Sequence, residues 1–338
     1  MSTHLYELPK SLTLNTKSAI KSHLSMAIDP ELSFKIIYDD DRRIYRINIK
    51  DRKEFFILKV RGIKVVKQLD LDVSDLEKEY QLLSSAWGSV KQMPKNFSMS
   101  QPIKVWPEFN AILMSGCEGE NLNDTFNKNI FAWAFSISQL KTLIYNSGYW
   151  LGCYHKASSS KKMLNNILTN RENNFLRMLT YLSNSPKNPL IKEQINSLKP
   201  IFKNLIETQE KGYACQIHGN YAFRNILCDT NQTNLVDFED ARIEHVAFDI
   251  GQFTAEILFK SQFPWIRHRK KTLLNAFKEG YEKTFSYENS TVKAYTIYHL
   301  IVHLYEHCGR KNSSKLSNIL LRYRIYYLGK LIKQLIKP

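Results

Sequence analysis

One stretch of the sequence, Gln216 to Glu239, gathers side chains that can carry chemistry. It reads QIHGNYAFRNILCDTNQTNLVDFE, with His218, Asn220 and Asn225 in its first half and Asp237 near its end. An amide oxygen and a carboxylate together suit a hard divalent cation that keeps several waters and completes its shell with phosphate oxygens. These residue types therefore indicate a magnesium-bound nucleotide as the ligand of the stretch.

The same stretch has the pattern of a β-hairpin that would position these groups. A short apolar run, Ile226 to Cys228, is followed by the turn-forming residues 229–233 and then by Leu235 and Val236. Two apolar runs around a cluster of turn residues predict a hairpin. The hairpin would bring Asn225, before its first strand, and Asp237, after its second, to the same end.

The spacing of these residues resembles that of a known family. His218-Gly219-Asn220 is followed after four residues by Asn225, and Asp237-Phe238-Glu239 begins twelve positions after Asn225. This order is similar to the catalytic and metal-binding core of the aminoglycoside phosphotransferase and choline kinase-like superfamily. The resemblance implies an α+β, bilobal protein-kinase-like fold, with a small antiparallel-sheet N-lobe and a larger, mainly helical C-lobe. It also implies ATP-dependent phosphoryl transfer to a hydroxyl group of a small molecule, sugar or glycan.

The resemblance also implies roles for residues of the core. Asn225 and Asp237 would hold Mg²⁺, and His218 belongs to the catalytic loop. The family has an aspartate that accepts the proton of the attacking hydroxyl, and this chain has Asn220 there. An amide orients a hydroxyl but takes no proton, and general-base assistance is worth about 10²- to 10⁴-fold, so transfer would be slow. Arg224 would either add positive charge near the transferred group or form a salt bridge in the C-lobe.

Two functional classes stay open because of Asn220. We favour an active phosphotransferase, since both expected metal ligands are present, with Glu239 or Asp240 as candidate substitutes for the missing base. The alternative is a pseudokinase-like protein that binds nucleotide or acts as a scaffold. In either class Asp249, in the segment Phe248-Asp249-Ile250-Gly251, matches the family's aspartate that braces the catalytic loop through hydrogen bonds.

The N-terminal part of the chain has the pattern of the small lobe. A helix is expected over 15–27, and three antiparallel strands are expected over Phe34–Tyr38, Arg43–Lys50 and Phe55–Val60. Lys59 would then grip the nucleotide phosphates, and an exposed strand lysine is the alternative. The loop 38–43 between the first two strands contains no glycine, so its backbone would approach phosphates less freely.

A helix over Asp72–Trp87 follows these strands in the predicted order. Its apolar residues Leu76, Tyr80, Leu83 and Trp87 fall on one face at helical spacing. Glu79 is the candidate partner of Lys59, and Glu77 is the fallback. A surface carboxylate is the alternative for both.

A buried strand over 109–114 leads into the polar segment 115–121, which resembles the hinge between lobes in the family. Backbone groups near Ser115 and Cys117 would meet the adenine edge. The expected domains are an N-lobe over 1–114, a hinge over 115–121 and a C-lobe over 122–338 that contains the catalytic hairpin 213–239.

The C-terminal part is predicted to be mostly helical, over Ile130–His155, Asn165–Leu182 and Ile191–Lys211. His155 is interpreted as a packed helix residue. Further on, His299, His303 and His307 share one helical stripe. The first and third lie roughly 12 Å apart on a straight helix, too far for one ion, so packed or substrate-facing histidines are favoured over a metal site.

The basic, amphipathic tail Leu320–Lys337 has two interpretations. It is either a membrane-surface helix, and hence a site of peripheral membrane contact, or a closing helix packed on the C-lobe. The second is favoured.

Composition limits the partners of the protein. The 338-residue chain has a net charge of +16, which bears on partners rather than on the fold. It would suit an anionic acceptor, and a generally basic surface is the alternative that the even spread of charge favours. No recognised nucleic-acid module is seen, which argues against nucleic acid. Five scattered cysteines fit reduced thiols, and the absence of a signal peptide or membrane-spanning run predicts a cytoplasmic protein.

Overall fold

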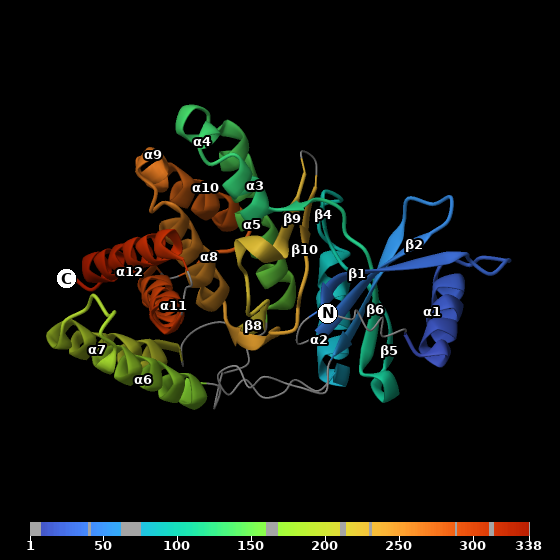
Figure 1. The fold of residues 1–338 in the computed structure, drawn as a ribbon, viewed down its shortest axis with the longest axis horizontal. Helices are drawn as coiled ribbons and strands as arrows, with labels where there is room; N and C mark the ends of the chain where they lie inside the picture. The colour runs from blue at the N-terminus through green and yellow to red at the C-terminus, as the bar shows by residue number, and fades with distance from the viewer. Residues whose placement is uncertain are drawn as a thin grey trace. The chain divides into compact units, whose positions relative to one another are not determined.

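The structure is a computed structural model, and it describes residues 8–39, 42–61, 76–159, 168–209, 214–229, 232–287, 289–310 and 314–337. The chain forms two compact units, which we treat separately (Figure 1). The first ends at Glu118 and excludes Gln92–Ser98, and the second comprises that segment and everything from Gly119. The boundary at 118/119 falls within the segment 115–121, where the hinge is expected, and Gln92–Ser98, within the range expected for the N-lobe, groups with the second unit.

The first unit is built on an antiparallel sheet in the order β1-β2-β3-β6-β5. Its elements are α1 (Lys10–His23), β1 (Leu32–Asp39), β2 (Arg42–Ile49), β3 (Phe55–Arg61), α2 (Leu76–Val90), β5 (Pro102–Trp106), a 3₁₀ turn (Pro107–Phe109) and β6 (Ala111–Ser115). The three strands predicted near the N-terminus are β1 to β3. The strand predicted over 109–114 is β6.

Two helices cover opposite faces of this sheet. Alternate residues of a strand face opposite sides. Phe56 and Leu58 of β3 pack with Leu12 and Ile20 of α1 in the core, whereas Lys59 meets α2 on the other face. Figure 1 shows α1 and α2 on either side of the sheet.

The boundaries of both helices differ from the prediction. The helix expected over 15–27 begins at Lys10, directly after Pro9, because the residues that it buries, Leu12, Thr16 and Ile20, recur every four positions. It ends before Ser25, whose backbone is left-handed at φ 51°. The helix expected over 72–87 is described from Leu76, and residues 72–75 lie outside the described residues.

The buried face of α2 also differs from the one predicted. It consists of Leu76, Glu79, Leu83, Ala86 and Val90. Tyr80 and Trp87, which were predicted to lie on this face, are only partly buried. A glutamate thus takes a place on the buried face, which is explained by its ion pairs described below.

The second unit combines two small sheets with most of the helices. Its strands, in the orders β4-β10-β9-β7 and β11-β8, are β4 (Phe97–Met99, whose last residue belongs to the first unit), β7 (Glu120–Asn121), β8 (Ala214–Ile217), β9 (Ile226–Cys228), β10 (Thr233–Leu235) and β11 (Arg242–His245). The segment before β4 joins this unit because Thr233 N–H donates to the Asn96 carbonyl at 3.0 Å, and the Trp150 indole donates to the Ser98 carbonyl at 3.2 Å.

The helices of the second unit are α3 (Leu122–Lys128), α4 (Ala132–Phe135), α5 (Ser138–Ser158), α6 (Leu168–Asn184), α7 (Lys192–Gln209), α8 (Ala247–Lys260), α9 (Pro264–Arg267), α10 (Lys270–Glu282), α11 (Asn289–Gly309) and α12 (Lys315–Leu335). The helix predicted over 130–155 is therefore α4 and α5, and those over 165–182 and 191–211 are α6 and α7. Helix α8 packs against α11, and α10 against α5. The second pair approaches closely because a Cβ at Gly148 or Gly280 would collide with a carbonyl of the facing helix.

The basic tail forms the closing helix α12, beside α11 (Figure 1). It buries Leu321, Ile325, Leu328, Leu331 and Ile332 within the second unit. Its apolar stripe therefore packs on protein, as the favoured interpretation states. No described helix is long and apolar enough to cross a membrane. All five cysteines are free thiols.

Candidate active site

The catalytic stretch forms the hairpin that its sequence predicts. Strands β9 and β10 pair antiparallel, with Ile226 opposite Leu235. The turn between them is closed by the Asp229 carboxylate, which accepts from Gln232 N–H at 2.7 Å. At the other end, Val236 N–H donates to the Asn225 carbonyl at 3.0 Å. The residue after Val236 is Asp237, so the two predicted metal ligands lie at the same end of the hairpin.

Asn225 and Asp237 offer the donor set of a hard cation. Asn225 is buried, and its side-chain N–H donates to the Asn220 carbonyl at 2.8 Å. Its amide oxygen is therefore the atom suited to a cation. Asp237 has a left-handed backbone at φ 65°, a conformation that Asp adopts more readily than most side chains and that often marks functional sites. An amide oxygen and a carboxylate fit Mg²⁺ accompanied by phosphate oxygens.

A buried carboxylate holds the loop that precedes the hairpin. Asp249, at the start of α8, accepts hydrogen bonds from the N–H groups of His218 at 2.7 Å and Gly219 at 2.9 Å. The ring Nε2 of His155 lies 3.2 Å from the same carboxylate and must donate to it, since a carboxylate only accepts. Gly219 has φ 79° and a Cβ there would collide with the Asp240 carbonyl, so only glycine fits.

The charge state of this group follows from its surroundings. Burial alone would raise the pKa of the Asp249 carboxyl, but the hydrogen bond and charge of His155, with a further contribution from His218, outweigh burial and lower that pKa. The carboxylate is therefore ionised whenever the protein is folded near neutral pH. It holds two consecutive backbone N–H groups of the loop and one imidazole, which are the bracing contacts that the resemblance implies.

His218 is fully buried, and both of its ring nitrogens are hydrogen bonded. Its Nε2 lies 3.0 Å from the Val236 carbonyl, to which it donates, and its Nδ1 accepts from Asn220 N–H at 3.2 Å. Burial lowers the pKa of the imidazole, so the ring is neutral. The sequence placed His218 among the catalytic residues. The structure supports a positioning part, in which the ring joins the Asn220 loop to the strand that leads to Asp237.

The side chain of Asn220 is half-buried and points to two hydrogen-bond donors. Its Oδ1 accepts from Arg224 Nη2 at 3.0 Å and from Gln252 Nε2 at 3.2 Å. Arg224 is exposed. Both alternatives for its role, a place beside the reacting group and a salt bridge in the C-lobe, stay predictions. The pKa of the nearby Asp240 carboxyl is raised by burial, against the lowering influence of Arg242.

The first unit contains the predicted lysine and its partner. Lys59 Nζ donates to Glu79 Oε1 at 3.0 Å, and the two residues are only 4% and 3% exposed. Arg61 pairs with the other oxygen of Glu79. The contact predicted between Lys59 and Glu79 is thus present, and the fallback Glu77 is exposed. Two cations thus share the carboxylate of Glu79.

The expected adenine contacts lie at the end of β6. The Ser115 N–H donates to the Gln101 carbonyl and its hydroxyl accepts from Gln101 N–H, at 2.9 and 2.8 Å. Gly116 N–H donates to the Phe55 carbonyl at 2.8 Å. Cys117 has its thiol 3.6 Å from the Ser100 hydroxyl, and burial raises the pKa of that thiol. Contact of this segment with adenine stays a prediction, and it would use groups other than these two N–H donors.

Three partners in these clusters were missed from the sequence. Arg61 lies two residues after Lys59 and so on the same face of β3, a signal that was available. Gln252 lies three residues after Asp249 on α8, which places both on one helical face. His155 was expected to be packed, and it is, but its bond to Asp249 depends on the approach of α5 to α8, which the sequence does not encode locally.

The C-terminal histidines have separate surroundings within α11. His299 packs edge-on against Phe248, His303 stacks on Phe259 and lies 3.6 Å from Glu256, and His307 Nδ1 donates to the His303 carbonyl at 2.8 Å. No group of His, Cys, Asp and Glu suited to a metal is found in the described part of the chain. The interpretation as packed histidines agrees with these contacts.

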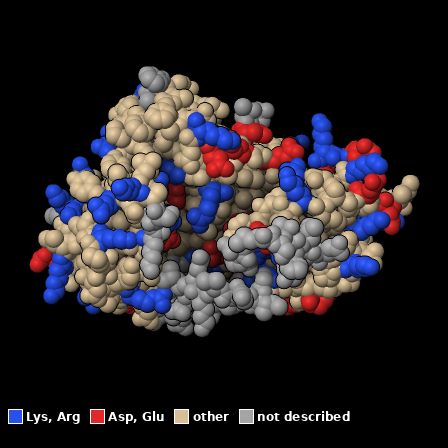
Figure 2. All heavy atoms as spheres, in the orientation of Figure 1, with Lys and Arg blue, Asp and Glu red and all other residues tan. Residues whose placement is uncertain are grey.

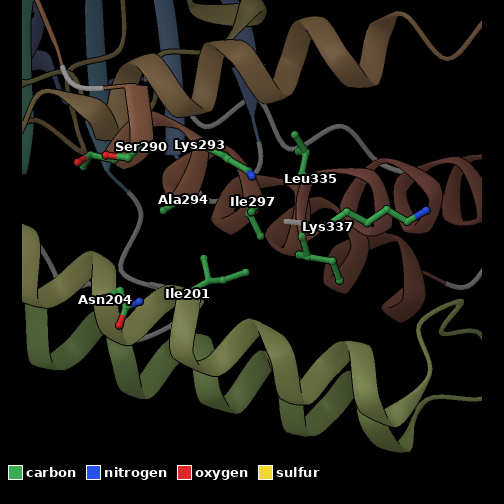
Figure 3. A pocket seen from close by; sticks show the side chains of 10 residues that line it. Ile201, Asn204, Ser290, Lys293, Ala294, Ile297, Leu335 and Lys337 are labelled. Carbon is green, nitrogen blue, oxygen red and sulfur yellow. The ribbon is translucent and has the colours of Figure 1, made fainter.

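A separate pocket of about 280 Å³ opens between α7, α11 and α12. Its lining is mainly apolar, and Figure 3 shows Ile201 of α7 projecting toward the side where Ile297 of α11 lies. Lys293 and Lys337 are its charged residues, and it has no carboxylate. The pocket therefore lacks the groups that a magnesium-bound nucleotide requires.

The lysine and arginine side chains on the face shown in Figure 2 are not concentrated in one place. Figure 2 shows Lys and Arg side chains scattered over several parts of the face in view, interspersed with Asp and Glu. The lysines and arginines visible on this face form no single patch. The net charge of +16 identifies no partner by itself.

Comparisons with known proteins agree with this geometry. The model of the phosphotransferase enzyme family matches residues 70–289, well over half of the chain. A methylthioribose kinase of Bacillus velezensis is 29% identical over 168 residues, which cover 42% of this chain and 41% of that protein, so the match spans less than half of the relative.

Two solved structures show the same fold. A glucosamine kinase in complex with glucosamine, ADP and inorganic phosphate aligns with a TM-score of 0.64 at 11% identity, covering 98% of this chain and 84% of the other. A choline kinase from Cryptosporidium parvum aligns with a TM-score of 0.54 at 14% identity, covering 91% and 92%. The α+β, kinase-like fold predicted from the sequence is therefore confirmed.

Proposed function

Because this chain belongs to the phosphotransferase enzyme family, we propose that it transfers the terminal phosphoryl group of ATP to a small molecule, with Mg²⁺ held by Asn225 and Asp237. The observation that supports the proposal is that Asn225 and Asp237 lie at the same end of the β9–β10 hairpin, where Val236 N–H bonds to the Asn225 carbonyl. Phosphoryl transfer asks little covalent chemistry of a protein, so positioning and charge neutralisation suffice.

Each cluster would contribute one task. Lys59, held by Glu79, would contact the phosphates, and Arg61 would help to hold Glu79 in place. The metal, when bound, neutralises charge on the phosphate oxygens. Asp249 and His218 would hold the loop backbone so that Asn220 stands beside the acceptor. Arg224 would add positive charge near the transferred group.

The names of the relatives suggest the class of acceptor. Methylthioribose, glucosamine and choline are small polar molecules that carry hydroxyl groups. They give their names to kinases that are similar to this chain in part of its sequence or in fold. A sugar, an amino alcohol or a related small molecule is therefore the acceptor that we propose. We also propose that the segment 115–117 contacts the adenine, as its place after β6 suggests.

A nucleotide-binding protein without transferase activity is the second candidate. It is favoured by Asn220 alone, because an amide takes no proton from a hydroxyl. Steady release of ADP that depends on an acceptor would exclude it. Binding of nucleotide without any turnover would support it.

The proposal is tested by replacing the carboxylate that would hold the metal. Thermal unfolding of the wild type should shift upward with Mg-ATP, since a ligand at about 100 times its dissociation constant adds about 2.7 kcal/mol. The Asp237→Asn variant should bind Mg-ATP at least about tenfold more weakly, because the amide lacks the charge of the carboxylate. Asn also tolerates the left-handed backbone of position 237, so the fold should be retained.

Asp51→Asn is the matched control. Asp51 is an exposed turn residue with a similar left-handed backbone, at φ 60°. This variant should keep the full response to Mg-ATP. A wild type without any response, or an Asp237→Asn variant that responds like the wild type, would contradict the proposal.

A further inference from the structure

A pocket of about 190 Å³ lies where the end of α11 meets the first half of α12. Arg310 comes directly after Gly309, the last residue of α11, and the other lining residues belong to α12. The lining consists of Arg310, Ser317, Leu320, Leu321 and Arg324. No described residue of the catalytic loop or hairpin is among them, so the pocket is distinct from the candidate active site.

The two arginines of this pocket lack a counterion in the described part of the chain. Neither guanidinium makes an ion pair or a hydrogen bond there. Glu306 is the last acidic residue of the sequence, and it forms no ion pair with Arg310, although the i,i+4 spacing would allow one. Arg324 is partly buried, and burial, followed by the charge of Arg310, lowers the pKa of its guanidinium. Two like charges held close together, one of them partly out of water, cost free energy unless an anion offsets them.

The neighbouring titratable groups add to this excess of positive charge. Burial, with the charges of Arg310 and Arg324 adding to it, lowers the pKa of His307 to about 4, so the imidazole is neutral. Burial also lowers the pKa of Lys260, and there the charge of Arg324 acts in the same direction, against that of Glu256. The surroundings of the pocket therefore favour an anion.

The pocket lies away from the catalytic loop. Lys260, whose pKa Arg324 affects, comes eleven residues after Asp249 on α8, since 260 minus 249 is 11. At about 1.5 Å per residue, this separation is roughly 16 Å along the helix. The pocket and the loop that Asp249 holds are thus separate places on the second unit.

The chemistry of the lining indicates the class of ligand. A guanidinium has five N–H donors and binds phosphate or carboxylate oxygens in bidentate fashion. A phosphate monoester carries a charge of about −1.5 to −2 at pH 7, which matches two arginines, whereas a carboxylate would neutralise only one. Leu320 and Leu321 add an aliphatic wall, and Leu316 and Ile319 of the same helix are 68% and 64% exposed. The lining therefore fits a phosphate group attached to an aliphatic chain.

We propose that Arg310 and Arg324 bind a phosphate monoester that carries an aliphatic group, at a site separate from that of the nucleotide. This inference goes beyond the proposed function and does not depend on phosphoryl transfer. Two sources share this chemistry, a soluble alkyl phosphate and the headgroup of an anionic lipid such as phosphatidic acid. The bound anion offsets the repulsion between the two guanidinium groups.

Binding of hexyl phosphate tests the site directly. We would measure its dissociation constant by isothermal titration calorimetry on the full chain, in EDTA so that no metal assists binding at Asn225 and Asp237. The wild type should bind hexyl phosphate at least about tenfold more tightly than hexanoate or hexanol. Arg310→Gln and Arg324→Gln should each weaken binding by at least about tenfold, because each removes charge-assisted hydrogen bonds.

Arg322→Gln is the matched control. Arg322 is an exposed arginine of α12 that does not line the pocket, so this variant should keep the affinity of the wild type. Arg310 is exposed as well, and its substitution should leave the fold intact. Without ligand, Arg324→Gln should unfold at the temperature of the wild type or above it, because the repulsion from Arg310 is gone. Equal affinity in all four proteins, no binding by the wild type, or hexanoate bound as tightly as hexyl phosphate overturns the proposal.

Vesicles distinguish the two sources of the phosphate group. We would sediment the protein with phosphatidylcholine vesicles that either contain or lack phosphatidic acid. Binding that requires phosphatidic acid and is lost in Arg310→Gln and Arg324→Gln identifies a lipid headgroup, and binding of hexyl phosphate alone identifies a soluble ester. Vesicle binding that both variants retain, without binding of hexyl phosphate, contradicts the site. An oligoribonucleotide that binds through the same arginines as tightly as hexyl phosphate contradicts the ligand class.

Discussion

Two sets of polar residues meet on the loop 218–220, and they differ in how completely they are satisfied. In the buried set, Asp249 accepts from two backbone N–H groups and from His155, and His218 uses both ring nitrogens. In the half-exposed set, the oxygen of Asn220 has two donors, while its nitrogen has no acceptor among the described residues. The first set is closed, and the second is open to a ligand.

This difference separates what holds the loop from what the loop presents. The backbone is held by Asp249 whatever side chain stands at position 220, and Asn has the same shape as Asp. The identity of residue 220 can therefore change the chemistry of the site without changing the fold. Asn220, where the sequence is expected to depart from the family pattern, falls in the open set, and Asp249, where it is expected to match, falls in the closed set.

We expect the largest loss of stability from a substitution of Asp249, the residue at the centre of the closed set. Asp249→Asn replaces one acceptor oxygen by a donor, so at least one of the three N–H groups that point at the carboxylate would face another donor. A buried donor without an acceptor costs about 1–3 kcal/mol, and loss of the charge beside His155 adds to this. We expect the free energy of unfolding, measured by urea denaturation, to fall by about 3 kcal/mol.

Asp229→Asn is the control for this change. Its carboxylate lies in the exposed hairpin turn and accepts from Gln232 N–H, a bond that an asparagine oxygen retains. Its stability should stay close to that of the wild type. Equal losses in the two variants would show that Asp249 does not hold the loop.

Local patterns predicted much of the fold and of the site. The β9–β10 hairpin follows from apolar runs and turn residues within one short stretch, and it positions Asn225 and Asp237 together. The pairing of Lys59 with Glu79 follows from a strand, a helix and their order in the resembling family. In both cases the determining interactions are encoded by neighbouring residues or by a specific motif.

Other features depend on tertiary contacts and were missed for that reason. The segment before β4 belongs to the second unit because Thr233 and Trp150 bond to its backbone, and nothing in its own sequence indicates this. Helix α1 begins before the predicted start, since its buried stripe is decided by the sheet that it covers. The contact of Gln252 with Asn220, on which the open set depends, joins a loop to a helix and is visible only in three dimensions.

We expect a change of pH to have an intermediate effect on the free energy of unfolding, because His218 of the closed set takes up a proton more readily in the unfolded chain. Burial lowers the pKa of its imidazole in the folded protein, while the unfolded chain takes up a proton below about 6.5. The unfolded state thus binds more protons as the pH falls. The contribution of His218 to stability is complete above about pH 6.5 and is lost as the pH falls from there toward the folded-state pKa, by at most about 1.4 kcal/mol per pH unit.

Long-range ¹H–¹⁵N NMR measures this directly. Between pH 8 and pH 5.5, His218 should keep the shifts of a neutral ring protonated at Nε2, whereas the urea-unfolded protein should titrate near pH 6.5. An imidazole that gains a proton near pH 6.5 in the folded protein would mean that the closed set is accessible to water. The contrast between the two sets would then be lost.

The smallest effect on stability is expected in the open set, from Gln252→Leu. Gln252 donates to Asn220, but its own oxygen is buried and has no hydrogen-bond partner among the described residues. Removing the amide therefore abolishes one hydrogen bond and also one unsatisfied acceptor, and such paired losses nearly cancel. The free energy of unfolding in urea should change by less than about 1 kcal/mol. With one of its two donors gone, however, the Asn220 amide is held by Arg224 alone, so its orientation is less fixed and ADP release with an acceptor should slow. A loss of stability as large as that of Asp249→Asn would mean that the two sets form one network, and that residue 220 is part of the scaffold rather than a group presented to the substrate.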